Sequence, residues 1–551
     1  MNFLFQHLIV LPIVLPLLTA AVLLFLDDQR RRLKSILSVS STLLGLVVAV
    51  TILNRVDHGS GSGNLHVYLA SNWRAPIGIV LVADRLSALM LVLTSVVGVC
   101  SALYAESRWM RASVYFHPLF QIQLMGLCGA FLTGDLFNLF VFFEVMLAAS
   151  YGLQLHGSGR ARVRSGLHYI AVNLVASSLF LIGLSVLYGV LGTLTMADMA
   201  DKVALVAAQD RGLMHAGAAI LALAFLIKAA IWPLNAWLAP AYSATSAPVA
   251  ALFAIMTKVG IYTLLRLWTL FFSEEAGDSA GFGQSVLLGG GLLTIAFGTF
   301  GMLASARLAR LASYSLIVSS GTLLAALGMG SPAVTAAALY YLLSGTLAAS
   351  ALFLLVELIE RITDSDETPL ADIDDADRLT GEDTNLDDQE RPLVGRVLPV
   401  STALIALGFM AAVMVIAGIP PLSGFVAKLS LLSAIVGADT TERALGVSAG
   451  WVLCGLLLLS GLASTVALVR VGIRSFWSSG GGQAKATRVE GIAVVVLLAG
   501  TFGLAFGAEP VLRYTTAAAS GLHGPKFYID TVLSANPVLR GGGSTETEGE
   551  P

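Results

Sequence analysis

The chain has 551 residues, of which 56% are hydrophobic and only 12% are charged, and its formal net charge at pH 7 is −3. The core of a soluble protein of this length could not bury so large an apolar share, which excludes an ordinary soluble domain. The composition therefore indicates an integral membrane protein.

Long apolar stretches recur along the chain and are separated by short polar breaks. A spanning helix needs about 20 apolar residues. This rule predicts an all-α polytopic protein with about fourteen transmembrane helices, in a single membrane domain over residues 1–510. The predicted spans are 3–26, 33–53, 77–104, 114–133, 135–155, 165–192, 213–231, 246–272, 285–306, 312–330, 334–360, 398–417, 445–472 and 488–508, with 419–437 as the second half of a broken helix.

The polar breaks predict how the chain is oriented. The first apolar stretch has neither a basic start nor a small-residue cleavage site, so we expect it to remain as the first span. Cytoplasmic breaks carry an excess of lysine and arginine. If the amino terminus lies outside, nineteen of these residues fall in cytoplasmic breaks and ten in outer breaks and the tail. The distribution predicts that both termini lie outside.

Two longer polar segments lie between or after the predicted spans. Residues 362–397 hold twelve acidic residues, which predict a solvated cytoplasmic loop, with cation collection or partner docking as the alternative role. Residues 511–551 are predicted to be a polar, largely disordered tail. We expect no cofactor, because no phosphate-cradling or dinucleotide motif occurs. We expect no metal site, because the three cysteines stand singly in apolar stretches, where they pack.

Four ionisable residues lie well inside apolar stretches. A charge near the bilayer centre costs about 2.5–3.5 kcal/mol even on the mildest scale, so such residues indicate function. A lysine that is removed from water favours its neutral form and can exchange protons near neutral pH. We interpret the four as a proton relay, and the alternative is a structural ion pair that only holds helices together. They are Glu144, Lys228, Lys258 and Lys428.

Prolines interrupt the seventh and twelfth apolar stretches, at Pro233 and Pro240 and at Pro420 and Pro421. Proline removes an intrahelical hydrogen bond, so the freed backbone groups must face protein or a water-lined cavity. A lysine lies close to each interruption, which favours paired broken helices along a transport pathway. A proline kink that serves only packing is the alternative.

The stretch GDLFNLFVFFEVM over residues 134–146, preceded by Pro118-Leu-Phe, resembles the D-type subunits of the Mrp/Pha multisubunit cation/proton antiporters. That family is homologous to the antiporter-like subunits of respiratory complex I, and the likeness covers the chain to about residue 510. It implies two inverted five-helix repeats, 114–272 and 285–472, each with one broken helix. It also implies a bacterial inner membrane, hydrophobic partner subunits, and transport of H⁺ and Na⁺ or K⁺, without nucleic acid.

The resemblance also implies which residues form the proton path. In the family, this path runs along the membrane centre through a glutamate of the fifth span and lysines of the seventh, eighth and twelfth spans. The motif matches place these roles on Glu144, Lys228, Lys258 and Lys428.

One part of the chain departs from the family pattern. Related proteins often carry a histidine in the eleventh span, where this chain has Ser344 and Ala349. If the path continues there, water or the hydroxyls of Ser344 and Thr346 must bridge it. His215 and His168, near the starts of the seventh and sixth spans, are candidates to feed protons into the path, with simple solvation or capping as the alternative.

The sequence therefore favours a transporter subunit over an enzyme. The first hypothesis is a proton-conducting subunit of a multisubunit Na⁺/H⁺ or K⁺/H⁺ antiporter, which relays protons along the buried Glu/Lys series. The alternative is a proton-pumping membrane-arm subunit of NADH-quinone oxidoreductase or of a membrane-bound hydrogenase. A scaffold without conduction of its own is the third reading. No residue indicates a preference between Na⁺ and K⁺.

Overall fold

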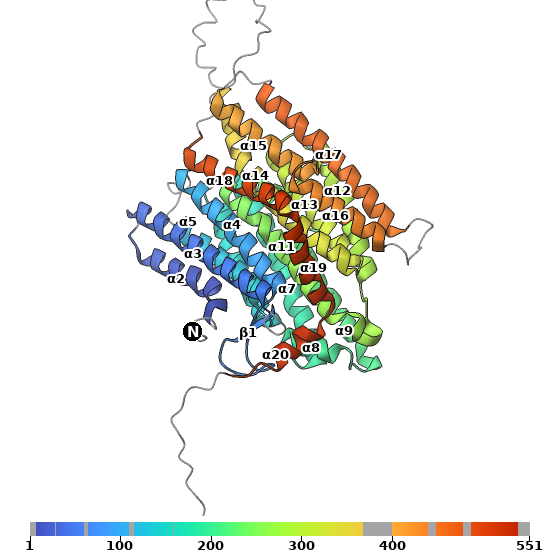
Figure 1. Cartoon of the computed structure of the whole chain (residues 1–551). Helices are drawn as coiled ribbons and strands as arrows, with labels where there is room; N and C mark the ends of the chain where they lie inside the picture. The colour runs from blue at the N-terminus through green and yellow to red at the C-terminus, as the bar shows by residue number, and fades with distance from the viewer. Residues whose placement is uncertain are drawn as a thin grey trace, which may run out of the picture.

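The computed structural model describes residues 7–27, 29–59, 64–108, 115–157, 159–366, 399–438, 448–477 and 486–537. Helices dominate it, and they pack side by side into one bundle (Figure 1). In chain order they are η1 His7–Ile9, α2 Leu11–Phe25, α3 Arg31–His58, α4 Arg85–Arg108, α5 Phe116–Leu132, α6 Leu136–Leu155, α7 Arg160–Leu191, α8 Met196–Val203, α9 Ala208–Lys228, α10 Leu238–Ala244, α11 Ala247–Phe271, η4 Glu274–Ser279, α12 Gln284–Ala304, α13 Leu308–Gly328, α14 Pro332–Asp366, α15 Val400–Ala417, α16 Ser423–Ala438, α17 Ala449–Trp477, α18 Arg488–Phe506, α19 Ala508–His523 and α20 Lys526–Leu533.

Twelve helices of the described residues are long and apolar enough to cross a membrane, and α2, α5 and α16 are shorter apolar helices. Each predicted span overlaps one of these helices. The polytopic helical fold is thus confirmed, whereas the exact number of crossings and the inverted repeats stay predictions. Of the acidic segment 362–397, residues 367–397 lie outside the described residues.

The start of the third predicted span is wrong. Residues 77–84, expected to be helical, include strand β2 (Val80–Ala83), which pairs antiparallel with β1 (His66–Leu69). Helix α4 begins only at Arg85 because Asp84 and Ser87 cap it reciprocally, with each backbone N–H donating to the other side chain at 2.9 Å. The apolar residues of β2 are buried as a strand instead.

The prediction for the carboxyl-terminal tail is also wrong for residues 511–537. They belong largely to helices α19 and α20, because α19 is amphipathic and buries one face that includes Ala518, Ala519 and Leu522. Helix α19 packs against α14, α4 and α11. Residues 538–551 of the predicted tail lie outside the described residues.

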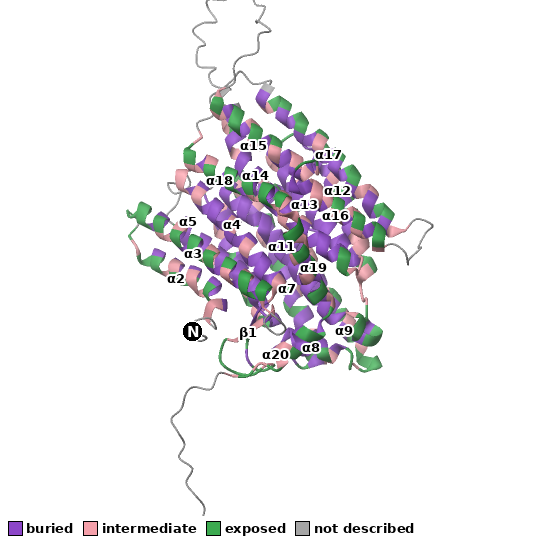
Figure 2. Cartoon of the chain, viewed as in Figure 1, coloured by how far each residue is buried: buried purple, intermediate pink, exposed green. Residues whose placement is uncertain are grey.

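Buried residues concentrate on α4, α11, α13 and α14, whereas α3, α15, α17 and α18 carry exposed faces (Figure 2). Every residue of α11 is buried. The exposed side chains of the outer helices are largely apolar, as expected for surfaces that face lipid. Helix α11 is therefore the structural centre of the bundle, and both charged residues on it, Lys258 and Arg266, are buried.

The two ends of the bundle differ. Helix η1, the β1–β2 hairpin, α8 and α20 gather at one end, which we call the hairpin end (Figure 1). Helix η1 contacts β2, and α20 contacts α8. Helices η1 and α20, the first and last helices of the described residues, thus lie at the same end of the bundle.

Candidate functional site

The first helix interruption lies between α9 and α10. Helix α9 ends at Lys228, and α10 begins at Leu238, so Pro233 lies in the irregular segment between them. Pro240 lies instead in the first turn of α10, where the N–H that proline lacks would have no intrahelical partner. Pro233 therefore belongs to the interruption, and Pro240 belongs to the helix that follows it.

Side chains replace part of the hydrogen bonding that the helix loses at this interruption. The backbone N–H of Trp232 donates to Thr294 Oγ1 at 3.0 Å. Further along, the indole Nε1 of Trp237 donates to the Ile227 carbonyl at 3.1 Å. Non-helical backbone is tolerated at membrane depth only where protein or water satisfies it. At the first interruption, the Thr294 hydroxyl of α12 and the Trp237 indole satisfy part of the freed backbone.

Lys228 is the last residue of α9, and its side chain is only 5% exposed. Its Nζ lies 5.0 Å from the centroid of the Phe143 ring, and its charge interacts with that of Glu144. Within the described residues, Nζ has no hydrogen-bond partner. A cation at a helix carboxyl end is favoured by the exposed carbonyls of the last turn. The ammonium is held by these longer-range interactions.

Glu144 is the ninth residue of the 20-residue helix α6, so it lies about 12 Å along the helix from its start. The hydroxyl of Ser177, on α7, donates a hydrogen bond to Glu144 Oε1. Helix α6 starts at this register because the Asp135 side chain caps it, accepting from the Asn138 N–H at 2.8 Å. Glu144 is partly exposed on the surface of the bundle.

The second interruption lies between α15 and α16. Helix α15 ends at Ala417, and Pro420 and Pro421 lie before α16 begins. The side chain of Lys428, on α16, reaches back to donate from Nζ to the Ala417 carbonyl at 2.8 Å. Gly461 of α17 leaves room for this contact, because a Cβ there would lie 3.0 Å from Nζ. Each interruption thus places a lysine ammonium at the carboxyl end of a half-helix.

Lys258 lies on the central helix α11 and is fully buried. Its Nζ donates to Ser319 Oγ, on α13, at 2.8 Å. The Tyr341 hydroxyl, on α14, interacts with the side chains of Ser319 and Thr322. Three helices therefore contribute polar groups to a small cluster around Lys258, in an otherwise apolar core.

The eleventh predicted span corresponds to α14, and its hydroxyl groups have different surroundings. The Ser344 and Ser423 hydroxyls are 2.8 Å apart, which joins α14 to the start of α16, one turn and a half before Lys428. Thr346 is fully buried, and its Oγ1 has no partner within the described residues. Ala349 is buried as well. Of the two proposed bridging hydroxyls, only that of Ser344 is hydrogen-bonded to the second broken helix within the described residues.

The two candidate histidines lie apart from the buried lysines. His215 is thirteen residues before Lys228 on α9, about 20 Å along the helix. Its ring stacks on Phe282 with centroids 4.1 Å apart, and its Nε2 lies 3.1 Å from Ser279 Oγ. His168 is exposed on α7. Neither residue is placed beside Lys228 or Glu144 by the structure.

Residues 133–454 match the family model described as NADH:quinone oxidoreductase/Mrp antiporter, TM. The chain belongs to this family. It is 50% identical over 533 residues to the probable D-type K⁺/H⁺ antiporter subunit of Rhizobium meliloti, covering 96% of this chain and 98% of that protein. It is 32% identical over 539 residues to the D-type Na⁺/H⁺ antiporter subunit of Alkalihalophilus pseudofirmus, covering 96% and 99%.

Solved structures in the NADH:quinone oxidoreductase/Mrp antiporter family share the fold. A chain of the Mrp complex from Dietzia superposes with a TM-score of 0.79 at 26% identity, covering 96% of this chain and all of that one. A chain of respiratory complex I from Thermus thermophilus superposes with a TM-score of 0.73 at 21% identity, covering 96% and 100%. The resemblance inferred from the GDLFNLFVFFEVM stretch is confirmed.

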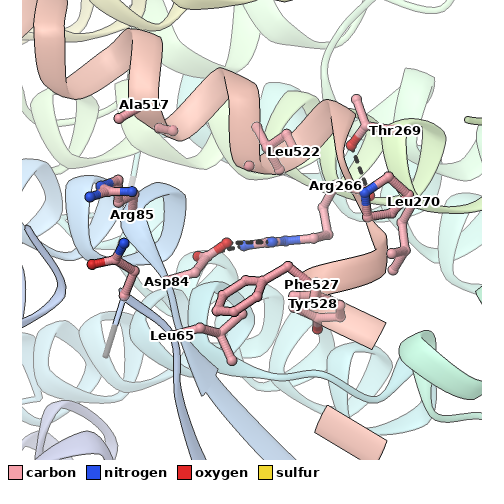
Figure 3. A pocket seen from close by; sticks show the side chains of 14 residues that line it. Leu65, Asp84, Arg85, Arg266, Thr269, Leu270, Ala517, Leu522, Phe527 and Tyr528 are labelled. Atoms are coloured by element: carbon pink, nitrogen blue, oxygen red, sulfur yellow. Dashed lines mark hydrogen bonds and ion pairs between the residues drawn. The ribbon is translucent and has the colours of Figure 1, made fainter. Parts of the chain in front are cut away.

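This member of the NADH:quinone oxidoreductase/Mrp antiporter family also contains a buried ion pair that the sequence did not reveal. Arg266 lies within α11 and donates to both oxygens of Asp84, at 2.6 and 2.7 Å (Figure 3). The Arg266 guanidinium also lies 5.3 Å from the Tyr528 ring of α20. Burial by itself would raise the pKa of Asp84, but the Arg266 charge and hydrogen bonds hold it below its ordinary value.

Two other buried groups lie at the end opposite the hairpin. Arg361 Nη1 donates to Glu490 Oε1 at 2.8 Å, and the Glu490 side chain is fully buried. Lys34, His117 and His156 are all at most 6% exposed, and the charges of Lys34 and His156 act on His117. The partners come from distant parts of the chain, so no local sequence pattern could have found them. Within the described residues, no group of three or more His, Cys, Asp or Glu side chains could hold a metal ion.

Proposed function

We propose that this chain is the proton-conducting subunit of a multisubunit monovalent cation/proton antiporter of the bacterial cell membrane. One observation carries the proposal. Lys228 ends α9, the Nζ of Lys428 reaches the last carbonyl of α15, and Lys258 lies buried in the central helix. Glu144 interacts with the first of these lysines. Membrane proteins retain such costly charges mainly along ion and proton pathways.

The surroundings of each lysine suit proton exchange rather than permanent pairing. Lys228 has no hydrogen-bond partner within the described residues, and Lys258 donates to one serine hydroxyl. A permanently charged buried ammonium needs a close counter-ion and several acceptors to offset its desolvation. Because the Glu144 and Lys228 charges interact, protonation of one favours deprotonation of the other, and a proton can be passed on.

The same series can connect proton flow to export of a cation. A proton that crosses the whole membrane supplies ~2.3 kcal/mol per 100 mV of potential. We expect this energy to be used within the complete complex, because the Glu/Lys series of this chain handles protons. We take K⁺ as the first cation to test, since the 50% identical relative is named as part of a K⁺/H⁺ antiporter.

The surface around the second interruption supports assembly with other hydrophobic subunits. Ile419, Pro420 and Pro421 are exposed, although they form non-helical backbone between two apolar helices. Irregular backbone at membrane depth requires cover by protein or a water-filled cavity. We therefore expect another protein of the complex to cover this surface.

The test is cation-stimulated proton flux in vesicles from an antiporter-deficient bacterium that produces the whole complex. Lys228→Ala and Glu144→Ala should abolish the flux while the complex still assembles, as measured by co-purification of its subunits. Lys202→Ala is the control, because Lys202 pairs with Asp198 in a partly exposed contact on α8, away from the buried series. Wild-type flux in Lys228→Ala would refute the relay and leave the scaffold reading.

The co-purifying subunits also distinguish the antiporter from a respiratory pump. Small hydrophobic antiporter subunits support the proposal, whereas quinone-binding and iron–sulfur subunits would support the alternative. Orientation needs a separate measurement. Reporter fusions after α3 and after α20, at the hairpin end, should both report the outer side, because cytoplasmic breaks carry the excess of lysine and arginine.

A further inference from the structure

A polar cavity opens at the hairpin end, beyond the outer ends of α11 and α13. Its volume is about 480 Å³, and its lining includes Glu274, Gln284, Leu327 and His523. The cavity lies close to the surface, because Glu274 is exposed. A space of this size and polarity can hold many water molecules. It therefore gives solvent access to the ends of α11 and α13 that lie at the hairpin end.

His523 lies at the inner wall of this cavity, at the end of α19. Its Nε2 is 3.0 Å from the hydroxyl of Thr335, on the first turn of α14. Thr335 itself is 2% exposed. Burial lowers the pKa of His523, and the nearby Glu274 carboxylate partly opposes this shift. A histidine in this position is mainly neutral at pH 7 and can accept a proton.

Thr335 also lines a second, smaller cavity deeper in the bundle. This cavity has a volume of about 20 Å³, the size of about one water molecule, and only Thr335 and Tyr262 of its lining carry polar side chains. Helices α4, α11, α13 and α14 enclose it, and Leu327 lines both cavities. Its inner wall includes Ile261, Leu323 and Leu342.

The small cavity ends next to the polar cluster around Lys258. Ile261 is three residues from Lys258, and Leu323 is four residues from Ser319, so each is about one helical turn away. Leu342 directly follows Tyr341. The small cavity and the Thr335 hydroxyl therefore lie between the polar cluster around Lys258 and the outer cavity.

We propose that protons pass between Lys258 and the hairpin side of the membrane through this column, with His523 as the titratable group at its outer end. The inference rests on the proposed function, because it requires Lys258 to exchange protons. In each passage, the lysine ammonium releases a proton through the Ser319 hydroxyl and water, and the neutral imidazole of His523 accepts it. The imidazolium then releases it to water in the outer cavity.

The charged neighbours of His523 suit this role. Glu274 of η4 interacts with its charge, and would stabilise the imidazolium while it is present. The side chain of Lys526, on α20, is 77% exposed, and its Nζ lies 3.6 Å from Oε1 of Glu275, the second carboxylate of η4. Helix α14 contributes the neutral Thr335. The histidine can therefore gain a proton without a fixed positive charge beside it.

The decisive variant is His523→Gln, studied in the complete complex. Glutamine can keep a hydrogen bond to Thr335, but it has no proton to exchange near neutral pH. Proton flux should fall at least about tenfold, since a positioned acid–base group contributes about 10²–10⁴-fold where proton transfer limits the rate. His58→Gln is the matched control, because His58 is exposed at the end of α3 on the same side.

Two further measurements separate a proton-transfer role from a structural one. Imidazole added to His523→Ala on the hairpin side should restore flux, because the outer cavity admits a small base. Thr335→Val removes the hydroxyl and should also slow flux. Normal flux in both His523→Gln and Thr335→Val, with Lys258→Ala inactive, would overturn this route and leave the proposed function standing. Normal flux in Lys258→Ala as well would overturn the proposed function.

Discussion

The Asp84–Arg266 pair leads to a quantitative prediction about stability. We expect Asp84→Asn to destabilise the protein strongly, because it leaves the Arg266 guanidinium without its counter-ion. The two side chains are only 15% and 8% exposed, and both hydrogen bonds are short, at 2.6 and 2.7 Å. Breaking a buried, hydrogen-bonded pair in this way costs about 3–5 kcal/mol.

A cost of this size changes the ratio of folded to unfolded protein between roughly a hundredfold and a few thousandfold. The effect should begin at the hairpin end, because Arg266 also contacts the Tyr528 ring and thereby helps to hold α20. Chemical unfolding of the purified protein in detergent measures the cost. Protease sensitivity of α20 reports whether that helix detaches first.

Asp57→Asn is the matched control for this prediction. Asp57 pairs with Arg85 at 3.7 Å, and its side chain is 42% exposed. Exposed pairs of this kind contribute about 0–1 kcal/mol, so the control should cost little. Replacing both buried partners, as Asp84→Leu with Arg266→Met, should recover much of the lost stability. Equal costs for Asp84→Asn and Asp57→Asn would refute the reasoning.

Three other changes have defined outcomes. Gly424→Ala should destabilise the fold by about 1–3 kcal/mol, because the added Cβ would lie 1.8 Å from a backbone oxygen of α15. Gly437→Ala is the control in the same unfolding assay and should have little effect, because a Cβ there has no other atom within 4 Å. Ser319→Ala should slow proton flux in vesicles, because Lys258 loses the hydroxyl at 2.8 Å; unchanged flux would contradict the role of this contact. The pKa of Asp84 lies below its ordinary value of 3.8. The stabilisation that the ionised Asp84 side chain provides should therefore be complete above pH 3.8 and should be lost as the pH falls further below it. Chemical unfolding at pH 7 and near pH 3 tests this, and a loss already at pH 5 to 6 would contradict it.

Much of the fold could be predicted because its signals are local. Each spanning helix needs a continuous apolar stretch, so every predicted span overlaps an observed helix. The interruptions were visible because proline removes a hydrogen bond wherever it occurs within a helix. Lys228, Lys258 and Lys428 stood out because a charge inside such a stretch is costly regardless of its neighbours.

The errors share a different cause. Residues 80–83 form a strand because β1 lies beside them, and residues 511–537 are mainly helical because α14 and α4 cover one face of α19. An apolar run or a polar tail does not show in the sequence which partner it will meet. Pro240 was placed in the interruption although it lies in the first turn of α10, because the sequence does not show where the next helix starts.

The sequence by itself determined that this is a polytopic helical membrane protein with two interrupted helices and four ionisable residues inside apolar stretches. Only the tertiary structure decided what those residues touch. It placed Lys258 on Ser319, Lys428 on the Ala417 carbonyl and Arg266 on Asp84, which is 182 positions away in the chain. The physical reason is that burying a charge has a cost set by the local apolar stretch, whereas the groups that offset it come from helices distant in sequence.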